Sequence, residues 1–303
     1  MINWDFDFIN VPLEIDCSIG ENWFKMIAQN SLVDIKHLER VADQVRGEAI
    51  RLSHSAQTPH LGSSLSCIDI LVVLYWSILS IDSQDPKTPD RDRFILSKGH
   101  AATALYVTLA YRGFFPLEQL GNYAQPGSVM AEHPSIGSAP GIEAATGSLG
   151  HGLPIGLGMA LASQIQNFSY RVFVVMSDGE CNEGSVWEAA MVAPTHGLSN
   201  LVVVIDYNKW QATGRSQEVT SIDPLGDKWR AFGWNVYELD GNSIEDLVNV
   251  LASVPNSSNK PTAIIAHTIK GKGVSFMEDD NNWHYRIPTA SEVEEAKREL
   301  GLI

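Results

Sequence analysis

The chain has 303 residues, of which 44% are hydrophobic and 19% are charged, and its formal net charge at pH 7 is −15. This length can hold one large α/β domain or two small ones. The acidic balance argues against a nucleic-acid surface and against attraction to anionic membranes, and no apolar run approaches the roughly 20 residues that cross a bilayer. The first ten residues lack the features of a secretory signal and the three cysteines form no CxxC pair, so we expect a cytoplasmic protein.

The N-terminal part of the chain predicts an arm followed by two helices. Residues 1–33 show little periodicity, and we expect them to pack on the domain or on a partner. From Asp34, a plausible cap, apolar residues recur at helical spacing. Pro59 ends this helix, because proline disfavours helix in the residue before it, so residues 55–64 are predicted to be a loop. A second helix over 67–79 is apolar nearly all round and therefore buried.

Strands and helices alternate through the rest of the chain. We predict strands over 93–97, 172–176, 201–205, 234–239 and 261–267, and helices that end near 112 and span 153–165, 183–196, 244–251 and 291–300. The strand over 172–176 is a continuous apolar run, which is typical of a parallel sheet buried on both faces. The alternation predicts an α/β fold with a mainly parallel sheet and helices on both faces.

A polar turn follows each of two neighbouring strands. Asp178 and Gly179 come after the strand over 172–176, and Asn208 comes after the strand over 201–205. In an open α/β sheet, ligands bind beyond the carboxyl ends of the strands, so we expect Asp178 and Asn208 to lie side by side. One carboxylate, one amide oxygen and a nearby backbone carbonyl form a hard-oxygen site that suits Mg²⁺. The alternative is an ordinary βαβ unit with a polar turn.

Histidines also gather in predicted loops rather than on apolar helix faces. The five are His60, His100, His133, His151 and His284. No pair of them has the spacing of a zinc site. Imidazole can donate a proton to anionic or hydroxylated ligands, or accept one from them, at neutral pH. The long segment over 121–152 is rich in glycine and proline, and loops of this length are usually functional.

These segments, in chain order, resemble the motifs of the transketolase family of thiamine diphosphate (TPP) enzymes. Asp-Gly followed about thirty residues later by Asn resembles the family's diphosphate–metal motif. Four further segments resemble family motifs: SAQTPHLGSSLS (55–66), RDRFILSKGHA (91–101), PGIEAATGSLGHG (140–152), and TIKGKG (268–273) with Trp283 and His284. The resemblance covers about residues 34–300, and it implies one TPP-binding domain of the diphosphate-binding (PP) type over 34–303.

The resemblance also implies a role for each site residue. The magnesium ligands would be Asp178, Asn208 and the carbonyl oxygen of Trp210. The catalytic histidines would be His60 near the thiazolium, His133 at the donor's hydroxyl and carbonyl, and His284, which reaches toward phosphate and substrate. The cofactor contacts would be His100, Gly179, Asn208 and His284 around the diphosphate, the backbone of Gly147, Ser148 and Leu149 at the aminopyrimidine, and Glu183, which helps to connect the two cofactor sites.

The activity that the resemblance implies is transfer of a two-carbon ketol unit from a ketose or ketose phosphate to an aldehyde. The chain ends where the diphosphate-binding domain of a transketolase ends. We therefore expect the pyrimidine-binding (Pyr) domain and the C-terminal domain on a second subunit. The family pairs its two cofactor-binding domains across a two-fold interface, so the expected assembly is an α₂β₂ heterotetramer of carbohydrate metabolism.

The sequence departs from the family pattern near the substrate. The family's HPGG reads His60-Leu-Gly-Ser, its GQG reads Gly-His151-Gly, and its glycine after His284 is replaced by Tyr285 and Arg286; Ser177 replaces a glycine before Asp178. Three alternatives stay open. They are a deoxyxylulose-phosphate-synthase-like or other decarboxylating enzyme, a specialised biosynthetic carboligase, and a non-catalytic TPP-binding subunit. The RDRFILSKGHA segment counts against the first, and the intact metal pair counts against the last.

Overall fold

The structure is a computed structural model that describes residues 33–255 and 258–303. The chain divides into two units, Met1–Asp34 and Ile35–Ile303, and the second is the subject below. The arm predicted over 1–33 lies, apart from Val33, outside the described residues.

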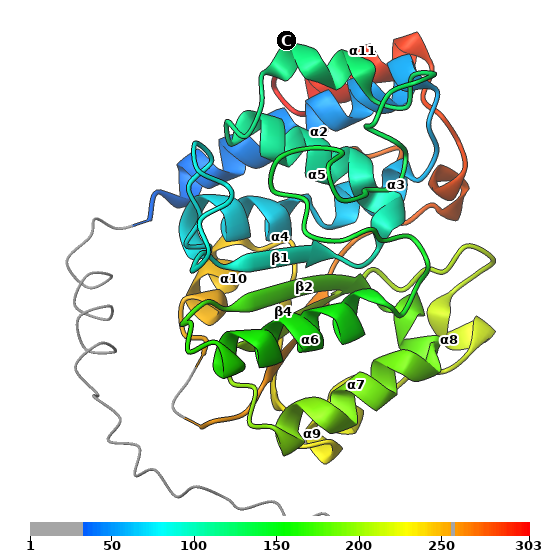
Figure 1. Ribbon diagram of the computed structural model, residues 1–303. Helices are drawn as coiled ribbons and strands as arrows, with labels where there is room; N and C mark the ends of the chain where they lie inside the picture. Colours follow the sequence, from blue (N-terminus) through cyan, green and yellow to red (C-terminus); the bar gives the residue numbers. More distant parts are fainter. Residues whose placement is uncertain (1–32, 256–257) are drawn as a thin grey trace, which may run out of the picture. The chain divides into compact units, whose positions relative to one another are not determined.

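A parallel sheet of five strands forms the centre of this unit (Figure 1). The strands are β1 (Arg93–Leu96), β2 (Val172–Ser177), β3 (Leu201–Tyr207), β4 (Asn235–Asp240) and β5 (Thr262–His267). Their order across the sheet is β1-β2-β3-β5-β4, and every neighbouring pair is parallel. Strands β2 and β3 are buried along their whole length, as the continuous apolar runs predict.

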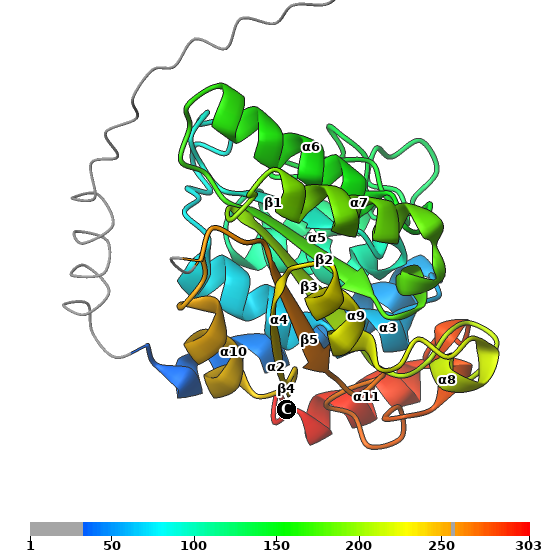
Figure 2. The same ribbon diagram turned by 90° about the horizontal axis from the view of Figure 1, so that it is seen from below.

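Helices cover both faces of the sheet, which confirms the predicted α/β class (Figures 1 and 2). One side carries α2 (Ile35–Ala56), α3 (Leu61–Ser66), α4 (Ile68–Val73), α5 (Ala102–Tyr111), α10 (Ile244–Leu251) and α11 (Ala290–Glu299). The other side carries α6 (Gly152–Ile165), α7 (Gly184–Thr195) and α9 (Leu225–Ala231). Short elements are α8 (Ser216–Val219), η1 (Leu74–Ile78), η2 (Gly99–Ala101), η3 (Leu117–Asn122), η4 (Gly179–Asn182) and η5 (Asn281–His284).

The strands divide their side chains between two hydrophobic cores. In β2, Phe173 and Val175 belong to the core beneath α2, α4 and α5, whereas Val172, Val174 and Met176 belong to the core beneath α6 and α7. This alternation follows from the two-residue period of a strand. Because helices cover both faces of the sheet, a site can form only around its margins, for example where the strands end.

The loop predicted over 55–64 is wrong in its second half. Helix α3 begins at Leu61, inside the predicted loop over 55–64, because His60 takes a left-handed conformation (φ 68°, ψ 20°) that starts a new helix directly after Pro59. The helix predicted over 67–79 is confirmed: α4 begins directly after Cys67, whose φ of −101° separates it from α3, and it continues into the π-helical turn η1, which ends at Ile78. Helices α8 and α9, which are short, were not predicted.

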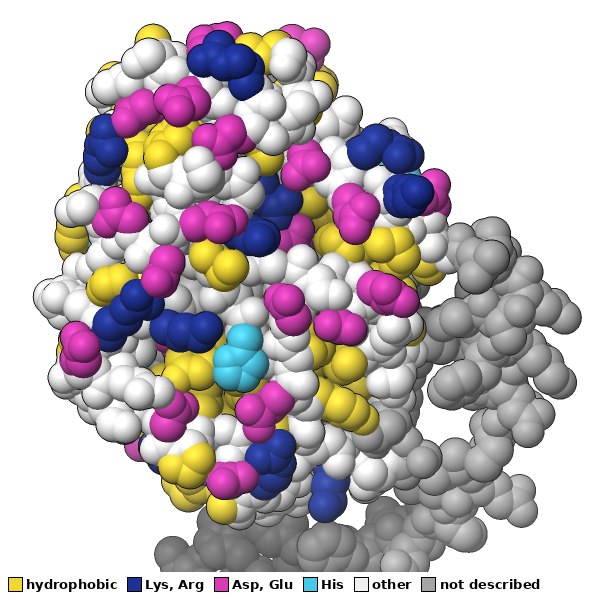
Figure 3. Space-filling view, turned by 180° about the vertical axis from the view of Figure 1, so that it is seen from behind, with side chains coloured by type: hydrophobic (Ala, Val, Ile, Leu, Met, Phe, Trp, Pro, Cys, Tyr) yellow, Lys and Arg dark blue, Asp and Glu magenta, His cyan; other side chains and the backbone are white. Residues whose placement is uncertain are grey.

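Charges of both signs are mixed on the face of the molecule opposite to that in Figure 1 (Figure 3). On the face in Figure 3, Lys and Arg side chains lie among Asp and Glu side chains and small hydrophobic groups. That face therefore presents no single-sign field that would steer a charged polymer. Within residues 33–255 and 258–303, no helix is both long and apolar enough to span a bilayer.

Candidate active site

The turn after β2 meets the loop after β3 at the carboxyl edge of the sheet. Ser177 pairs with Asp206 in the parallel register, so the next residues of both strands leave the sheet together. The buried carboxylate of Asp178 accepts hydrogen bonds from the Gly179 amide (3.0 Å), the Lys209 amide (3.1 Å) and the Ser216 hydroxyl (2.6 Å). Asp178 therefore contacts the residue next to Asn208, at the edge where the sequence predicted both.

The electrostatic surroundings of Asp178 favour a bound cation. Burial, together with the nearby carboxylate of Asp206, raises the pKa of Asp178 to about 6, although the Ser216 hydrogen bond opposes the rise. Its hydrogen-bond donors are two backbone amides and a hydroxyl, all neutral. A divalent cation at Asp178 would supply the missing positive charge and keep the carboxylate ionised.

Asn208 and Trp210 lie beside this carboxylate. The side-chain oxygen of Asn208 accepts from the Trp210 amide at 3.1 Å, and its amide nitrogen donates to Ser66 at 3.4 Å. Among the described residues, no group of three or more His, Cys, Asp or Glu side chains could hold a metal. The available donors are thus one carboxylate, one amide oxygen and backbone carbonyls, a set that suits Mg²⁺ with ligands completed by phosphate and water.

Hydrogen bonds to Glu180 connect the long loop over 121–152 to the turn after β2. The Glu180 carboxylate, which is fully buried, accepts from the Ser97 hydroxyl, from the Ser177 amide (3.0 Å) and from the Gly150 amide (3.0 Å). The Gly150 carbonyl in turn accepts from the Ser185 hydroxyl at 2.9 Å. Both backbone groups of Gly150 are therefore held by the segment that follows β2, and this position of Gly150 requires a positive φ of 83°.

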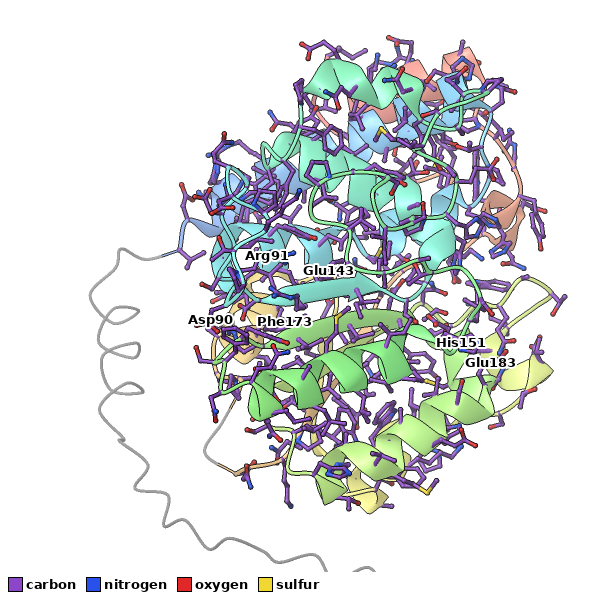
Figure 4. The ribbon with its side chains drawn as sticks, viewed as in Figure 1. Asp90, Arg91, Glu143, His151, Phe173 and Glu183 are labelled. Carbon is purple, nitrogen blue, oxygen red and sulfur yellow. The ribbon has the colours of Figure 1, made fainter. Side chains whose placement is uncertain are left out.

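The segment over 147–151 runs along the same edge. A Cβ atom on Gly147 would lie 2.5 Å from the His133 ring, so this glycine lets the ring approach the backbone. Ser148 and Leu149 follow in the turn that leads to Gly150. His151 and Glu183 lie together at the end of the sheet opposite Arg91 and Glu143, which form an ion pair (Figure 4). The long loop is thus tied at both ends of β1.

Four histidines from separate segments form one cluster centred on His60. The His60 ring centroid lies 4.8 Å from that of His284, 5.4 Å from His100 and 6.3 Å from His133. The His60 amide also donates to the His284 carbonyl at 2.8 Å. The structure therefore brings together four of the five histidines that the sequence placed in loops, and His151 stands apart beside Glu183.

Three of the clustered histidines, His60, His100 and His284, are neutral at pH 7. Burial lowers the pKa of His60 to about 4, with His133 and Lys270 adding to the effect, and burial with Lys270 lowers the pKa of His284 to about 3. Burial also holds the pKa of His100 well below its usual value. The Nδ1 atom of His60 is buried without a hydrogen-bond partner among the described residues. An unpartnered polar atom at the centre of the cluster indicates that a ligand completes it.

Lys270 is a site residue that the sequence analysis missed. It is buried, and its Nζ donates to the Asn281 side-chain oxygen at 2.6 Å and lies 3.3 Å from His284 Nδ1. Burial, with Lys98 nearby, lowers the pKa of Lys270 to about 8. These partners are neutral, so an anion beside Lys270 would compensate the charge of its ammonium group and raise its pKa. Its place three residues after the end of β5, at the edge where ligands bind, is the signal that could have identified it.

A second buried lysine, Lys98, was also missed. Its ammonium group forms a fully buried ion pair with Asp206 and donates to the Ser63 carbonyl at 2.8 Å. Asp206 accepts in addition from Ser66 at 2.6 Å and from Thr268. This network joins α3, β3 and β5 directly beneath the Asp178 turn, and it fixes the strand ends on which the site is built.

Three partly exposed residues, Trp210, Arg215 and Asp279, link the two loops of the site, and we call them the latch. The Asp279 carboxylate accepts from both Arg215 amino groups (2.7 and 2.6 Å) and from the Trp210 indole (2.8 Å). The Arg215 guanidinium lies 3.8 Å from the centroid of the Trp210 ring. Asn281 adds a hydrogen bond to the Ala212 carbonyl at 3.2 Å. The loop beside Asp178 is thereby tied to the loop that carries His284.

Replacing Arg215 with alanine is expected to loosen this loop without unfolding the protein. Exposed ion pairs and cation–π contacts are each worth no more than about 1 kcal/mol, so the melting temperature should change little. Hydrogen–deuterium exchange of residues 209–216 should become faster. Arg230→Ala is the matched control, because Arg230 also pairs with two carboxylates but lies outside the latch. Equal exchange in both variants would contradict the latch.

The fold and the site together define a thiamine diphosphate-binding domain. The family model described as "Transketolase, thiamine diphosphate binding domain" matches residues 38–303. Because this match covers most of the chain, the chain belongs to the transketolase family.

Named relatives agree with this membership. The chain is 42% identical over 268 residues to a subunit of the apulose-4-phosphate transketolase of Phocaeicola vulgatus, covering 88% of this chain and 95% of that relative. It is 40% identical over 246 residues to a 6-deoxy-6-sulfo-D-fructose transketolase subunit of Clostridium sp., covering 81% and 88%. Transketolase from Leishmania mexicana superposes with a TM-score of 0.82 at 27% identity, covering 87% of this chain. The chain spans 41% of that solved protein.

Proposed function

We propose that the chain is the diphosphate-binding subunit of a cytoplasmic split transketolase that uses TPP and Mg²⁺ and is active only with a second subunit. The complex transfers a two-carbon ketol unit from a ketose or ketose phosphate to an aldehyde. The partner supplies the Pyr domain and the C-terminal domain, in an α₂β₂ heterotetramer. Two relatives that are named as transketolase subunits support the proposal, because this chain covers 95% and 88% of their lengths.

A complementary pair of buried charges carries this proposal. Asp178 is held by neutral donors and Lys270 by neutral acceptors, at the same edge of the sheet. A diphosphate with its magnesium ion has the charge pattern that would compensate both side chains. The residues present therefore fit Mg²⁺-TPP, with Asp178, Asn208 and the Trp210 carbonyl at the metal and Lys270, His100 and Gly179 at the diphosphate.

Bound TPP supplies the carbanion chemistry of ketol transfer. This chain's residues hold the cofactor and serve the substrate. The backbone of Gly147, Ser148 and Leu149 would hold the aminopyrimidine, and Glu183 would connect the two cofactor sites of the assembly. His60 and His133 hydrogen-bond the donor's oxygens and move protons, and His284 contacts phosphate and substrate. Burial lowers the pKa values of His60 and His284 and keeps both rings neutral at pH 7, so each ring offers one nitrogen that donates a hydrogen bond and one that accepts.

The purified chain with TPP and Mg²⁺ is expected to show no ketol transfer, because the Pyr domain that completes the cofactor site lies on the partner. Co-expression with a transketolase C-terminal-type subunit of the same organism should restore transfer. Native mass spectrometry should then show a heterotetramer with two TPP and two Mg²⁺. Robust transfer by the chain alone would refute the split enzyme, and pyruvate consumption by the complex would favour a decarboxylating synthase instead.

A further inference from the structure

Tyr285 occupies a fixed position at the solvent side of the histidine cluster. Its backbone directly follows η5, and its amide donates to the Asn282 carbonyl at 3.2 Å. Trp283, two residues before it, is fully buried and donates from its indole to the Phe276 carbonyl at 3.1 Å. The His284 carbonyl is pinned to the His60 amide. The backbone can therefore move little, and the Tyr285 side chain must project from this one point.

The Tyr285 ring packs on two of the clustered histidines. Its centroid lies 4.6 Å from that of His284, with the ring planes at 83°, and 5.8 Å from that of His60, with the planes at 57°. Tyr285 is nevertheless 64% exposed. The ring therefore covers the histidines on one side and faces solvent on the other, and we call it the wall of the histidine cluster.

The side chain of the next residue, Arg286, does not contribute to this wall. The Arg286 guanidinium lies 4.3 Å from the centroid of the Trp283 ring and pairs with Glu292. No hydrogen bond among the described residues involves the Tyr285 hydroxyl. The wall is thus an uncharged aromatic ring, and it contributes bulk where the family pattern has a glycine.

We propose that Tyr285 is a specificity-determining residue that restricts the aldehyde acceptor to short chains, an inference that rests on the proposed ketol transfer. A tyrosine side chain has two rotatable bonds, and packing against His60 and His284 limits both, so a long acceptor cannot displace the ring at low cost. Discrimination by such a wall is of the order of 10-fold to 200-fold for small differences in substrate size. Short aldehydes pass the ring and reach His60, whereas longer sugar phosphates collide with it.

The test compares two acceptors in the co-expressed complex. Hydroxypyruvate serves as ketol donor, and kcat/KM is measured for glycolaldehyde and for ribose 5-phosphate in the natural protein, Tyr285→Gly and Tyr285→Phe. The natural complex should prefer glycolaldehyde. Tyr285→Gly should raise the ribose 5-phosphate to glycolaldehyde ratio by about 10-fold or more, and Tyr285→Phe should keep the natural ratio, because the ring and not the hydroxyl forms the wall.

A second measurement separates the wall from cofactor binding. TPP affinity by calorimetry should change far less than the acceptor ratio in Tyr285→Gly, because the contacts that position His284, its backbone hydrogen bond with His60 and its contact with Lys270, do not involve the Tyr285 ring. If the acceptor ratio is unchanged in Tyr285→Gly, or if it rises as much in Tyr285→Phe as in Tyr285→Gly, the Tyr285 ring does not determine acceptor specificity. The proposed ketol transfer would still stand. Absence of transfer to either acceptor in the natural complex would instead refute the proposed function, and the wall with it.

Discussion

Replacing Lys98 with methionine is expected to lower the free energy of unfolding by about 3–5 kcal/mol, the usual cost of leaving a buried charge without its partner. Lys98 and Asp206 are both fully buried, so water cannot solvate the carboxylate that remains. The hydrogen bonds from Ser66 and Thr268 to Asp206 persist but carry no charge. Urea denaturation followed by circular dichroism measures the loss, with an unchanged slope indicating that only stability has changed.

Two further variants test the cause of this loss. The double variant Lys98→Met with Asp206→Asn removes both charges and should recover part of the stability lost in the single variant. Lys297→Met removes a lysine from an exposed pair with Glu294 and should change the free energy of unfolding far less than Lys98→Met does. If Lys98→Met costs no more than Lys297→Met, the buried pair does not stabilise the strand ends.

Replacing Asp178 with alanine is expected to abolish Mg²⁺-dependent binding of TPP to the complex. The loss should exceed about 100-fold, since substitution of a residue that merely orients a metal ligand already costs about 10- to 100-fold. Isothermal titration calorimetry of TPP, with Mg²⁺ and with EDTA, measures this effect. In EDTA the variant and the natural complex should bind TPP equally weakly.

Two controls accompany this experiment. Asp178→Asn keeps the shape, and its single side-chain oxygen can still accept the Lys209 and Ser216 hydrogen bonds, whereas its amide nitrogen cannot accept the hydrogen bond from Gly179. A loss in both variants with an unchanged melting temperature therefore points to the charge and not to a disordered turn. Asp240→Ala removes an exposed carboxylate at the end of β4, on the same edge of the sheet, and should leave TPP affinity unchanged. Unchanged affinity in Asp178→Ala would remove this residue from the metal site.

The sheet, and the end of the sheet at which the site lies, could both be predicted from the sequence. The runs over 172–176 and 201–205 are too apolar for any element but a buried strand, and their parallel pairing brings Asp178 next to the loop after Asn208. The glycine-rich segments likewise indicated where backbone and ligand approach closely. These features depend on local pattern and on the general geometry of α/β sheets.

Other features depend on tertiary geometry that local pattern does not encode. A lysine after a strand usually reaches solvent, so neither the burial of Lys98 against Asp206 nor that of Lys270 against His284 follows from the sequence. The left-handed conformation of His60 is rare for a residue with a Cβ atom, and only the packing of Leu61 and the contact with His284 reveal it.

The hydrogen bonds of the Gly150 amide and carbonyl hold the end of the loop over 121–152, whereas the middle of this loop is less constrained. The amide and carbonyl of Gly150 are both taken by side chains of the Glu180–Ser185 stretch, so the last residues of the loop keep their place whatever happens upstream. Around Gly127 the chain is exposed and the space beside it is open. An affinity tag or a few extra residues inserted there should therefore be accommodated by the loop tip, which makes Gly127 the natural attachment point for a probe on this protein.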